Sequence, residues 1–134
     1  MLDINDWVNT NIKYLKDKPG DHWQTLAETI KLGTGDCEDF VIAKKFLAME
    51  RGIPEAELIM VYCLADTVAH MVLYWNGIIY DNRNLCGKLC THTDIIPYIG
   101  YTLHTSYIVT EWQFIEHKIV NTKIQNLIER HNND

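Results

Sequence analysis

The dipeptide Asn76-Gly77 restricts the possible folds of this chain more than any other feature of its sequence. Asn-Gly between two apolar runs is typical of the two-residue turn of a β-hairpin. Residues 69–75 and 78–82 are therefore predicted to form paired antiparallel strands. A turn of this length places Val72 opposite Asp81, so the hairpin also predicts which side chains share a face of the sheet.

Other segments extend this hairpin into a mixed fold. Residues 57–64 and 101–110 are also predicted to be strands, and residues 84–97 a polar, irregular loop. Helices are predicted over residues 4–15, 23–32, 37–51 and 115–130. Helices first, then an antiparallel sheet and a closing helix indicate an α+β fold, and 134 residues suit one domain spanning 1–134.

The third predicted helix has the clearest start. Asp36 follows Gly33-Thr34-Gly35 as an N-cap residue, and Asp39 lies three positions later, as in a capping box. Cys37 then falls in the first turn, on the core-facing side. The partial positive charge at a helix N-terminus favours a thiolate there. A cysteine on an apolar stripe is also a common core residue, so this placement alone does not establish a nucleophile.

His70 gives the cysteine a candidate base. It lies two residues from Val72 and therefore on the same face as Asp81, at a diagonal distance of roughly 7–8 Å. An aspartate there would accept from one imidazole nitrogen and fix the tautomer. Cys37, His70 and Asp81 are thus predicted to be nucleophile, base and orienting carboxylate. A half-buried strand histidine and a strand-end aspartate are the alternative interpretation.

Composition excludes several classes of function. The net charge of −6 and the absence of basic runs argue against nucleic acid as a partner. No apolar run is long enough for membrane insertion. The sequence begins without a signal peptide, which predicts a cytoplasmic protein, or a periplasmic one if a leader has been removed.

Four cysteines stand at positions 37, 63, 86 and 90. The run Cys86-x-x-x-Cys90-x-His92 suggests a metal-bound structural protein as one hypothesis, because these residue types bind zinc. The spacing is unusual for zinc and no second tight pair accompanies it, so free thiols or a disulfide are favoured there.

The segment Gly35-Asp36-Cys37-Glu38-Asp39-Phe40, followed by Ala43-Lys44, resembles the bacterial transglutaminase-like cysteine peptidase family (LapG-like). Further blocks fit the same family in the same order. They are Val8-Asn9 with Tyr14 and Asp17, Trp23-Gln24-Thr25 with Glu28, Ala69 to Leu73, and Asp81-Asn82. The resemblance spans roughly residues 5 to 110.

The resemblance implies a transglutaminase/papain-like fold and a cysteine endopeptidase that acts on a protein or peptide substrate through a thioester. It gives Cys37, His70 and Asp81 the triad roles, and it implies calcium bound by Asp36 and Glu38. The residues add a reason for a cation, because carboxylates beside Cys37 raise the pKa of its thiol and Ca²⁺ would cancel their charge. Helix capping by the same acidic residues needs no metal, and the chemistry itself requires no cofactor.

Trp23 is a candidate oxyanion donor through its indole N–H, alongside the backbone N–H of Cys37. A core tryptophan is an equally good interpretation of that position. Two other functions stay open from sequence alone. One is a transglutaminase, in which an amine rather than water resolves the thioester. The other is a calcium-dependent peptide-binding module that has lost its chemistry.

Overall fold

The computed structural model describes residues 1–16, 22–83 and 95–133. Three helices come first: α1 (Leu2–Asn11), α2 (Leu26–Leu32) and α3 (Cys37–Glu50). The short strands β1 (Lys13–Tyr14) and β2 (Thr34–Gly35) pair in parallel between them. A 3₁₀ turn, η1 (Glu55–Glu57), leads into the sheet, and α4 (Thr122–Asn133) ends the described chain.

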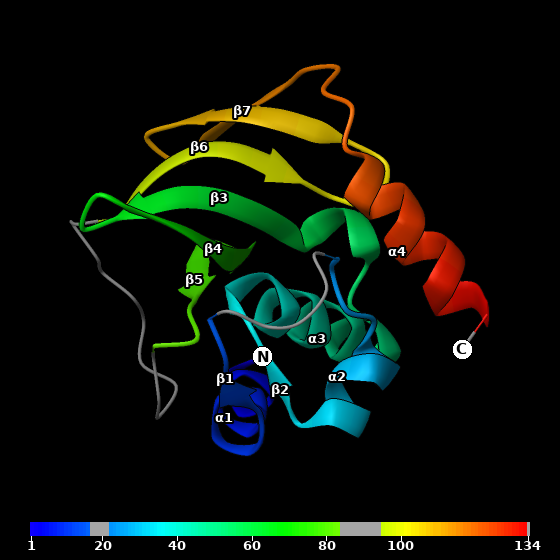
Figure 1. Ribbon diagram of the computed structural model, residues 1–134. Coiled ribbons are helices and arrows are strands. Elements are labelled where there is room, and N and C mark those ends of the chain that lie inside the picture. Colours follow the sequence, from blue (N-terminus) through cyan, green and yellow to red (C-terminus); the bar gives the residue numbers. More distant parts are fainter. Residues whose placement is uncertain (17–21, 84–94, 134) are drawn as a thin grey trace.

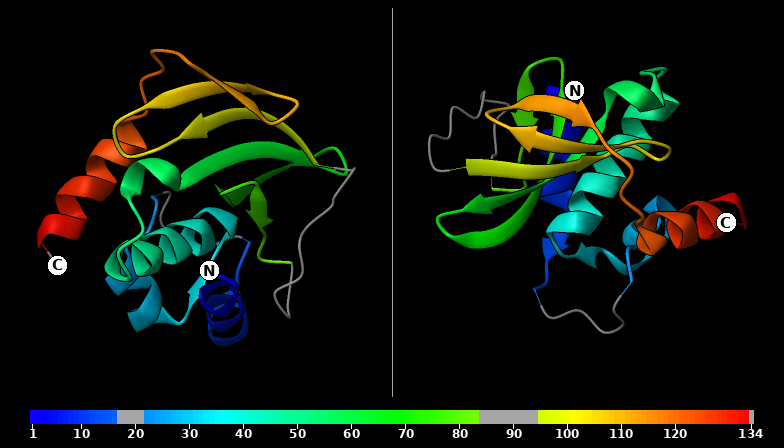
Figure 2. Two further views of the ribbon diagram at one scale, coloured as in Figure 1. Left: turned by 180° about the vertical axis from the view of Figure 1, so that it is seen from behind. Right: turned by 90° about the horizontal axis from the view of Figure 1, so that it is seen from above.

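The main sheet has six antiparallel strands in the order β5-β4-β3-β6-β7-β8. They are β3 (Ile59–Ala65), β4 (Val68–Trp75), β5 (Ile78–Tyr80), β6 (Ile95–Tyr101), β7 (Ser106–Thr110) and β8 (Gln113–Glu116). The sheet arches over α3, with α1 and α2 on the same side, and α4 extends from one end of it (Figures 1 and 2). The predicted α+β architecture is confirmed.

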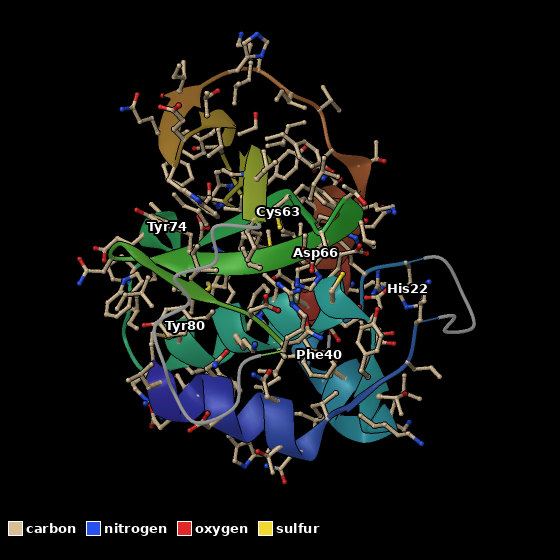
Figure 3. All side chains as sticks on the ribbon, turned by 90° about the vertical axis from the view of Figure 1, so that its left-hand side faces the viewer. His22, Phe40, Cys63, Asp66, Tyr74 and Tyr80 are labelled. Atoms are coloured by element: carbon tan, nitrogen blue, oxygen red, sulfur yellow. The ribbon has the colours of Figure 1, made fainter. Side chains whose placement is uncertain are left out.

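The core lies between α3 and the sheet. Phe40, Val41 and Ile42 of α3 are fully or almost fully buried against Met71 and Leu73 of β4. A second apolar cluster, built around Val61, Cys63 and Val72, occupies the other face of the sheet. Figure 3 shows this division, with Phe40 and Tyr80 on the helix side and Cys63 and Tyr74 on the other.

The start of α3 is fixed by the predicted capping box. The Asp36 side chain accepts from the backbone N–H of Asp39 at 3.2 Å, and the Asp39 side chain accepts from the backbone N–H of Asp36 at 3.0 Å. A Cβ atom at Gly35 would lie 2.7 Å from Cβ of Asp39, which explains why glycine precedes the cap. The capping box and Gly35 therefore fix the backbone at the start of α3, and Cys37 is the first residue of the helix.

The predicted hairpin is confirmed. Asn76 and Gly77 have φ angles of 52° and 79°, as a two-residue turn with both residues left-handed requires. Trp75 pairs with Ile78 and Leu73 with Tyr80. The same register continued by one residue brings Asp81 alongside Val72.

Two predicted helix bounds were wrong. The first helix ends at Asn11 rather than near residue 15, because the backbone N–H of Lys13 donates to Gly33 at 2.8 Å and joins the β1–β2 pair. The second begins at Leu26 rather than Trp23, because Thr25 caps it and Glu28 completes a capping box. Trp23 therefore lies in the connection before α2, not in a helix.

The predictions for the last third were also wrong in part. Residues 101–110 contain two elements, since β6 ends at Tyr101 and β7 begins at Ser106. The loop predicted over 84–97 overlaps the start of β6, and its residues 84–94 lie outside the described chain. The helix predicted over 115–130 is divided into β8 and α4. Positive φ angles at Glu111 and Trp112 turn the chain into β8, where it pairs with β7.

Candidate active site

The hairpin brings His70 and Asp81 together. His70 lies on β4 opposite Cys63, and Asp81 directly follows β5. Their Nε2 and Oδ1 atoms are 2.8 Å apart, and the Asp81 side chain is completely buried. Burial alone would raise the pKa of Asp81, but hydrogen bonds from His70 and Arg83 hold it well below its usual range. The carboxylate is therefore ionised near neutral pH.

Arg83 is a partner of Asp81 that the sequence did not reveal. Its backbone N–H donates to Oδ1 at 3.0 Å, while Nε and Nη2 donate to Oδ2 at 3.0 and 2.7 Å. Asn9 of α1 donates from Nδ2 to the Asp81 carbonyl oxygen at 3.0 Å. The nearest sequence signals were the Asp81-Asn82-Arg83 run and the family block Val8-Asn9, but neither specifies these bonds.

These contacts define the tautomer of His70. An ionised carboxylate only accepts hydrogen bonds, so Nε2 of His70 must carry the hydrogen that Asp81 receives. Nδ1 is then the basic nitrogen of the neutral ring. The hairpin thus presents an oriented imidazole, which is the arrangement required of a general base.

Cys37 meets the same strand from the start of α3. Its thiol is buried and accepts a hydrogen bond from the backbone N–H of Met71, the residue after His70. Strand β5 pairs with β4 only from Leu73 to Trp75, so this stretch of the β4 edge is open to the thiol. Sulfur and imidazole therefore come from adjacent positions along one strand edge.

The environment of the thiol disfavours its charged form. Burial is the largest cause, followed by the charge of Glu38, and together with Asp36 they raise the pKa of Cys37 to about 12. The backbone N–H groups of Met71 and Glu38 act in the opposite direction. This direction is the one expected for the carboxylates of Glu38 and Asp36, and it favours the neutral thiol.

The three acidic residues around Cys37 play different parts. Asp39 is completely buried, and its oxygens accept from the backbone N–H groups of Asp36 and Gln24, the latter at 2.9 Å. Asp36 and Glu38 are only partly buried. Within residues 1–16, 22–83 and 95–133, no group of three or more His, Cys, Asp or Glu side chains is arranged to hold a metal ion.

Trp23 lies beside this region. It is 2% exposed, and its ring centroid lies 6.3 Å from that of Tyr62. Tyr62 is in turn close enough to Glu38 and Cys37 that their charges, after burial, raise the pKa of its phenol. The indole Nε1 of Trp23 is buried and has no hydrogen-bond partner in the described part of the chain. A buried donor without an acceptor is uncommon in a native fold.

An exposed apolar strip leads away from the thiol along the helix side of the sheet. Tyr62 stacks on Tyr98 with ring centroids 6.2 Å apart. Leu64, two residues further along β3, pairs with Ile96 of β6. Leu64, Ile96 and Tyr98 are 38%, 61% and 39% exposed, so the strip formed by these four residues is accessible from solvent.

Cys63 is a second cysteine near the triad. The Cys63 thiol is buried on the far face of the sheet and donates to the carbonyl oxygen of His70 at 3.6 Å. Cys86, Cys90 and His92, the basis of the zinc hypothesis, lie outside the described residues.

Comparison with known proteins identifies the family. Residues 1–95 match the family model described as bacterial transglutaminase-like cysteine proteinase. The chain belongs to this family. The match includes Cys37, His70 and Asp81 and ends at the start of β6. No curated protein sequence matches the chain.

Solved structures of the same kind extend over almost the whole chain. Calcium-bound LapG of Legionella pneumophila is 26% identical, with a TM-score of 0.81 over 96% of this chain and 77% of LapG. EGTA-treated LapG from the same organism is 27% identical, with a TM-score of 0.78 over 96% and 76%. The predicted family and the transglutaminase-like fold are confirmed, and the protein is a transglutaminase-like cysteine peptidase.

Proposed function

We propose that this peptidase cleaves amide bonds with a triad of Cys37, His70 and Asp81. The observation that carries the proposal is the hydrogen bond between His70 and Asp81, next to a thiol seated on the N–H of Met71. All three groups come from segments that the family model covers. Their order along the chain is nucleophile, base, carboxylate.

The reaction runs through a thioester. Sγ of Cys37 attacks the amide carbonyl carbon as Nδ1 of His70 takes the thiol proton, so a C–S bond forms and the carbonyl oxygen becomes an oxyanion. Collapse of this intermediate breaks the C–N bond, and His70 gives its proton to the leaving amine. Water then attacks the thioester with His70 as base, the C–S bond breaks, and the proton returns to sulfur.

Asp81 keeps the imidazole in the working orientation through this cycle. Its ionised carboxylate accepts from Nε2 and stabilises the imidazolium that forms when Nδ1 takes the proton. Arg83 and Asn9 hold the aspartate in turn. Because burial and nearby charge raise the pKa of the Cys37 thiol, the attack needs His70 as acceptor of the thiol proton.

We assign the oxyanion site to the backbone N–H of Cys37 and the indole N–H of Trp23. A helix N-terminus supplies free N–H groups and a partial positive charge. The buried Nε1 of Trp23 supports the assignment, because a substrate oxyanion would supply the acceptor that residues 1–16, 22–83 and 95–133 do not offer it.

Asp36 and Glu38 are the residues that would hold a calcium ion. LapG has been solved both with calcium bound and after EGTA treatment. Carboxylate oxygens are the ligands that Ca²⁺ prefers, and these two flank the nucleophile. Bound calcium would neutralise the charge that now raises the pKa of Cys37. Asp39 has a structural role instead, because backbone N–H groups occupy its oxygens.

We place the substrate polypeptide along the apolar strip of Tyr62, Leu64, Ile96 and Tyr98. The strip starts beside the thiol and is open to solvent, whereas Met60, further along the same side of β3, is buried in the core. Apolar side chains of a substrate would be buried there on binding. Peptide and protein substrates are favoured because the strip offers exposed apolar contacts to side chains beside the scissile amide.

The triad can be tested with a small acyl donor. Wild-type protein treated with p-nitrophenyl acetate should release a burst of p-nitrophenol and carry an acetyl group on Cys37, located by mass spectrometry of peptides. Cys37→Ala should lose the burst, and His70→Ala should slow it about 10³-fold. His104→Ala is the matched control, since His104 is exposed on the turn before β7. A burst of equal rate in His70→Ala would contradict the triad.

The same acyl-enzyme distinguishes the alternative functions. Cleavage of peptides from a digested proteome without added amine supports an endopeptidase. Faster loss of the acetyl group in cadaverine, with the amine incorporated, supports acyl transfer. A folded wild-type protein with no acylation of Cys37 supports a non-catalytic binding module.

A further inference from the structure

The C-terminal helix reaches the loop that carries Trp23. Helix α4 is anchored to the core by Ile124 and Leu127, which are 5% and 0% exposed. One turn beyond Leu127, Nη2 of Arg130 donates to the carbonyl oxygen of Trp23 at 2.5 Å and to Oε1 of Glu28 at 2.6 Å. Residues more than a hundred positions apart in sequence are thereby joined at the edge of the candidate active site.

Glu28 holds Arg130 in place through several further hydrogen bonds. Its Oε1 also accepts from the backbone N–H of Thr25 at 3.1 Å, and its Oε2 lies 3.2 Å from the His22 ring. Burial would raise the pKa of Glu28, but the bonds from Arg130, Thr25 and His22 lower it to about 2. The carboxylate is thus charged near neutral pH and holds Arg130 beside the Trp23 carbonyl.

The peptide group between Trp23 and Gln24 is held at both ends. Its carbonyl oxygen accepts from Arg130, while its N–H donates to Oδ1 of Asp39 at 2.9 Å. A peptide group is planar, so fixing both polar atoms fixes its orientation and restricts the backbone from which the Trp23 side chain projects. One anchor belongs to α4, and the other to the first turn of α3, which also carries Cys37.

We propose that Arg130 is a positioning residue for the reaction, because it orients Trp23 so that the indole N–H meets the oxyanion. The inference rests on the proposed role of Trp23 as an oxyanion donor. It makes α4, which lies beyond residues 1–95 of the family match, a working part of the active site. If Arg130 only attached α4 to the rest of the domain, its substitution would lower stability and would not slow the oxyanion-forming step in particular.

Two reactions of the same thiol separate these roles. Acylation by p-nitrophenyl acetate passes through an oxyanion, whereas alkylation by iodoacetamide is a displacement at a saturated carbon and forms none. Arg130→Gln should slow acylation about 5- to 30-fold, a part of the 10²–10³-fold effect of losing an oxyanion donor. Alkylation of Cys37 should stay within about twofold. Arg130→Lys retains a donor for the Trp23 carbonyl and should recover part of the loss.

Arg51→Gln is the matched control, because it also removes a 2.6 Å arginine–carboxylate pair, here with Asp3 at the end of α3 opposite Cys37. It should leave both reactions unchanged. In a Trp23→Phe background, Arg130→Gln should add almost nothing to the acylation defect, as expected for two residues that act through one donor. All variants are compared below their unfolding midpoints, measured by circular dichroism.

Each outcome has one meaning. Equal slowing of both reactions, no slowing of acylation, or a full Arg130 effect in the Trp23→Phe background would overturn the positioning role. If Trp23→Phe acylates at the wild-type rate, the oxyanion assignment fails and the role of Arg130 fails with it. If Cys37→Ala retains the burst, the triad itself is wrong.

Discussion

The hairpin and the start of α3 both bring ionised side chains to the candidate active site, but they balance those charges in opposite ways. In the hairpin, the buried Asp81 is paired with His70 and Arg83, and its pKa is lowered. At the start of α3, burial and then the charges of Glu38 and Asp36 disfavour the thiolate and raise the pKa of Cys37 to about 12. The hairpin, the balanced half of the site, stabilises the ionised carboxylate of Asp81. The start of α3, the unbalanced half, opposes the thiolate that Cys37 must form.

This contrast indicates a division of labour. The base is oriented and charge-balanced before substrate arrives, because all of its partners come from the chain itself. The nucleophile is held neutral and becomes an anion only as its proton leaves. A peptidase built this way limits the reaction of its thiol with other electrophiles, since the thiolate is the reactive form.

Asp81→Asn should cause a severe loss of activity, because it removes the carboxylate of the balanced half. An amide at this position offers a donor as well as an acceptor, so it no longer enforces a hydrogen on Nε2 of His70. Acylation of Cys37 by p-nitrophenyl acetate should fall about 10³-fold or more. Asp66→Asn is the control, because Asp66 is an exposed turn residue with a φ of 49° that asparagine tolerates. Equal rates in the two variants would contradict the role of Asp81.

The lowered pKa of Asp81 in the balanced half should also appear in the pH dependence of the free energy of unfolding. A carboxyl whose pKa is lower in the folded than in the unfolded state contributes stability above its unfolded pKa, about 4, and loses it as pH falls. Asp81 and Glu28 are both of this kind. Wild-type protein should therefore lose stability from about pH 4.5 downwards, with Asp81 accounting for about 2 kcal/mol of the loss by pH 2.

Urea unfolding at pH 6 and pH 2.5 measures this dependence. Asp81→Asn should be less stable than wild type at pH 6 and should lose less on acidification. A residual slope should remain, because Glu28 still titrates in that variant. Parallel curves for wild type and Asp81→Asn would show that Asp81 is not held below its usual pKa.

The parts of this site that sequence predicted are the parts set by local rules. The reciprocal bonds of Asp36 and Asp39 depend on residues three positions apart, and the turn at Asn76-Gly77 sets the hairpin register by itself. Once the register is known, the meeting of His70 with Asp81 follows from the alternation of side chains. These predictions need no knowledge of the remaining chain.

The parts that sequence missed depend on tertiary structure. Arg130 meets Trp23 only because α4 folds back across the body, and no short-range pattern encodes that contact. The strand β8 was predicted as helix because Ile115, Ile119 and Val120 mimic helical spacing, although the first of these pairs with Ile108 in the sheet. Asn9 of α1 donates to the Asp81 carbonyl oxygen only because α1 packs beside the hairpin. The family pattern includes Asn9, but it does not predict this hydrogen bond.

Glu38→Gln should reduce the negative charge that opposes thiolate formation at Cys37 in the unbalanced half. Removing that charge lowers the pKa of Cys37, and each unit of lowering should speed iodoacetamide labelling at pH 8 about 3- to 5-fold, because the larger thiolate fraction outweighs its weaker nucleophilicity. Ca²⁺ added to wild type should have the same effect, reversed by EGTA, and should have little effect on Glu38→Gln. Glu50→Gln, at the far end of α3, is the control. Unchanged labelling in both conditions would show that the charge of Glu38 does not contribute to the raised pKa of Cys37.

The smallest expected effect concerns the apolar strip, which lies beside the unbalanced half and contributes no charge. Leu64→Ser with Ile96→Ser should raise KM for peptide cleavage several-fold, because less apolar area is buried on binding, and should leave kcat nearly unchanged. Acylation by p-nitrophenyl acetate should not change, since that molecule is too small to need the strip. Ile115→Ser is the control, because Ile115 is as exposed as Ile96, at 61%, but lies on β8 at the opposite edge of the sheet from the hairpin. A loss of kcat, or an equal effect of Ile115→Ser, would show that the strip supports the fold rather than the substrate.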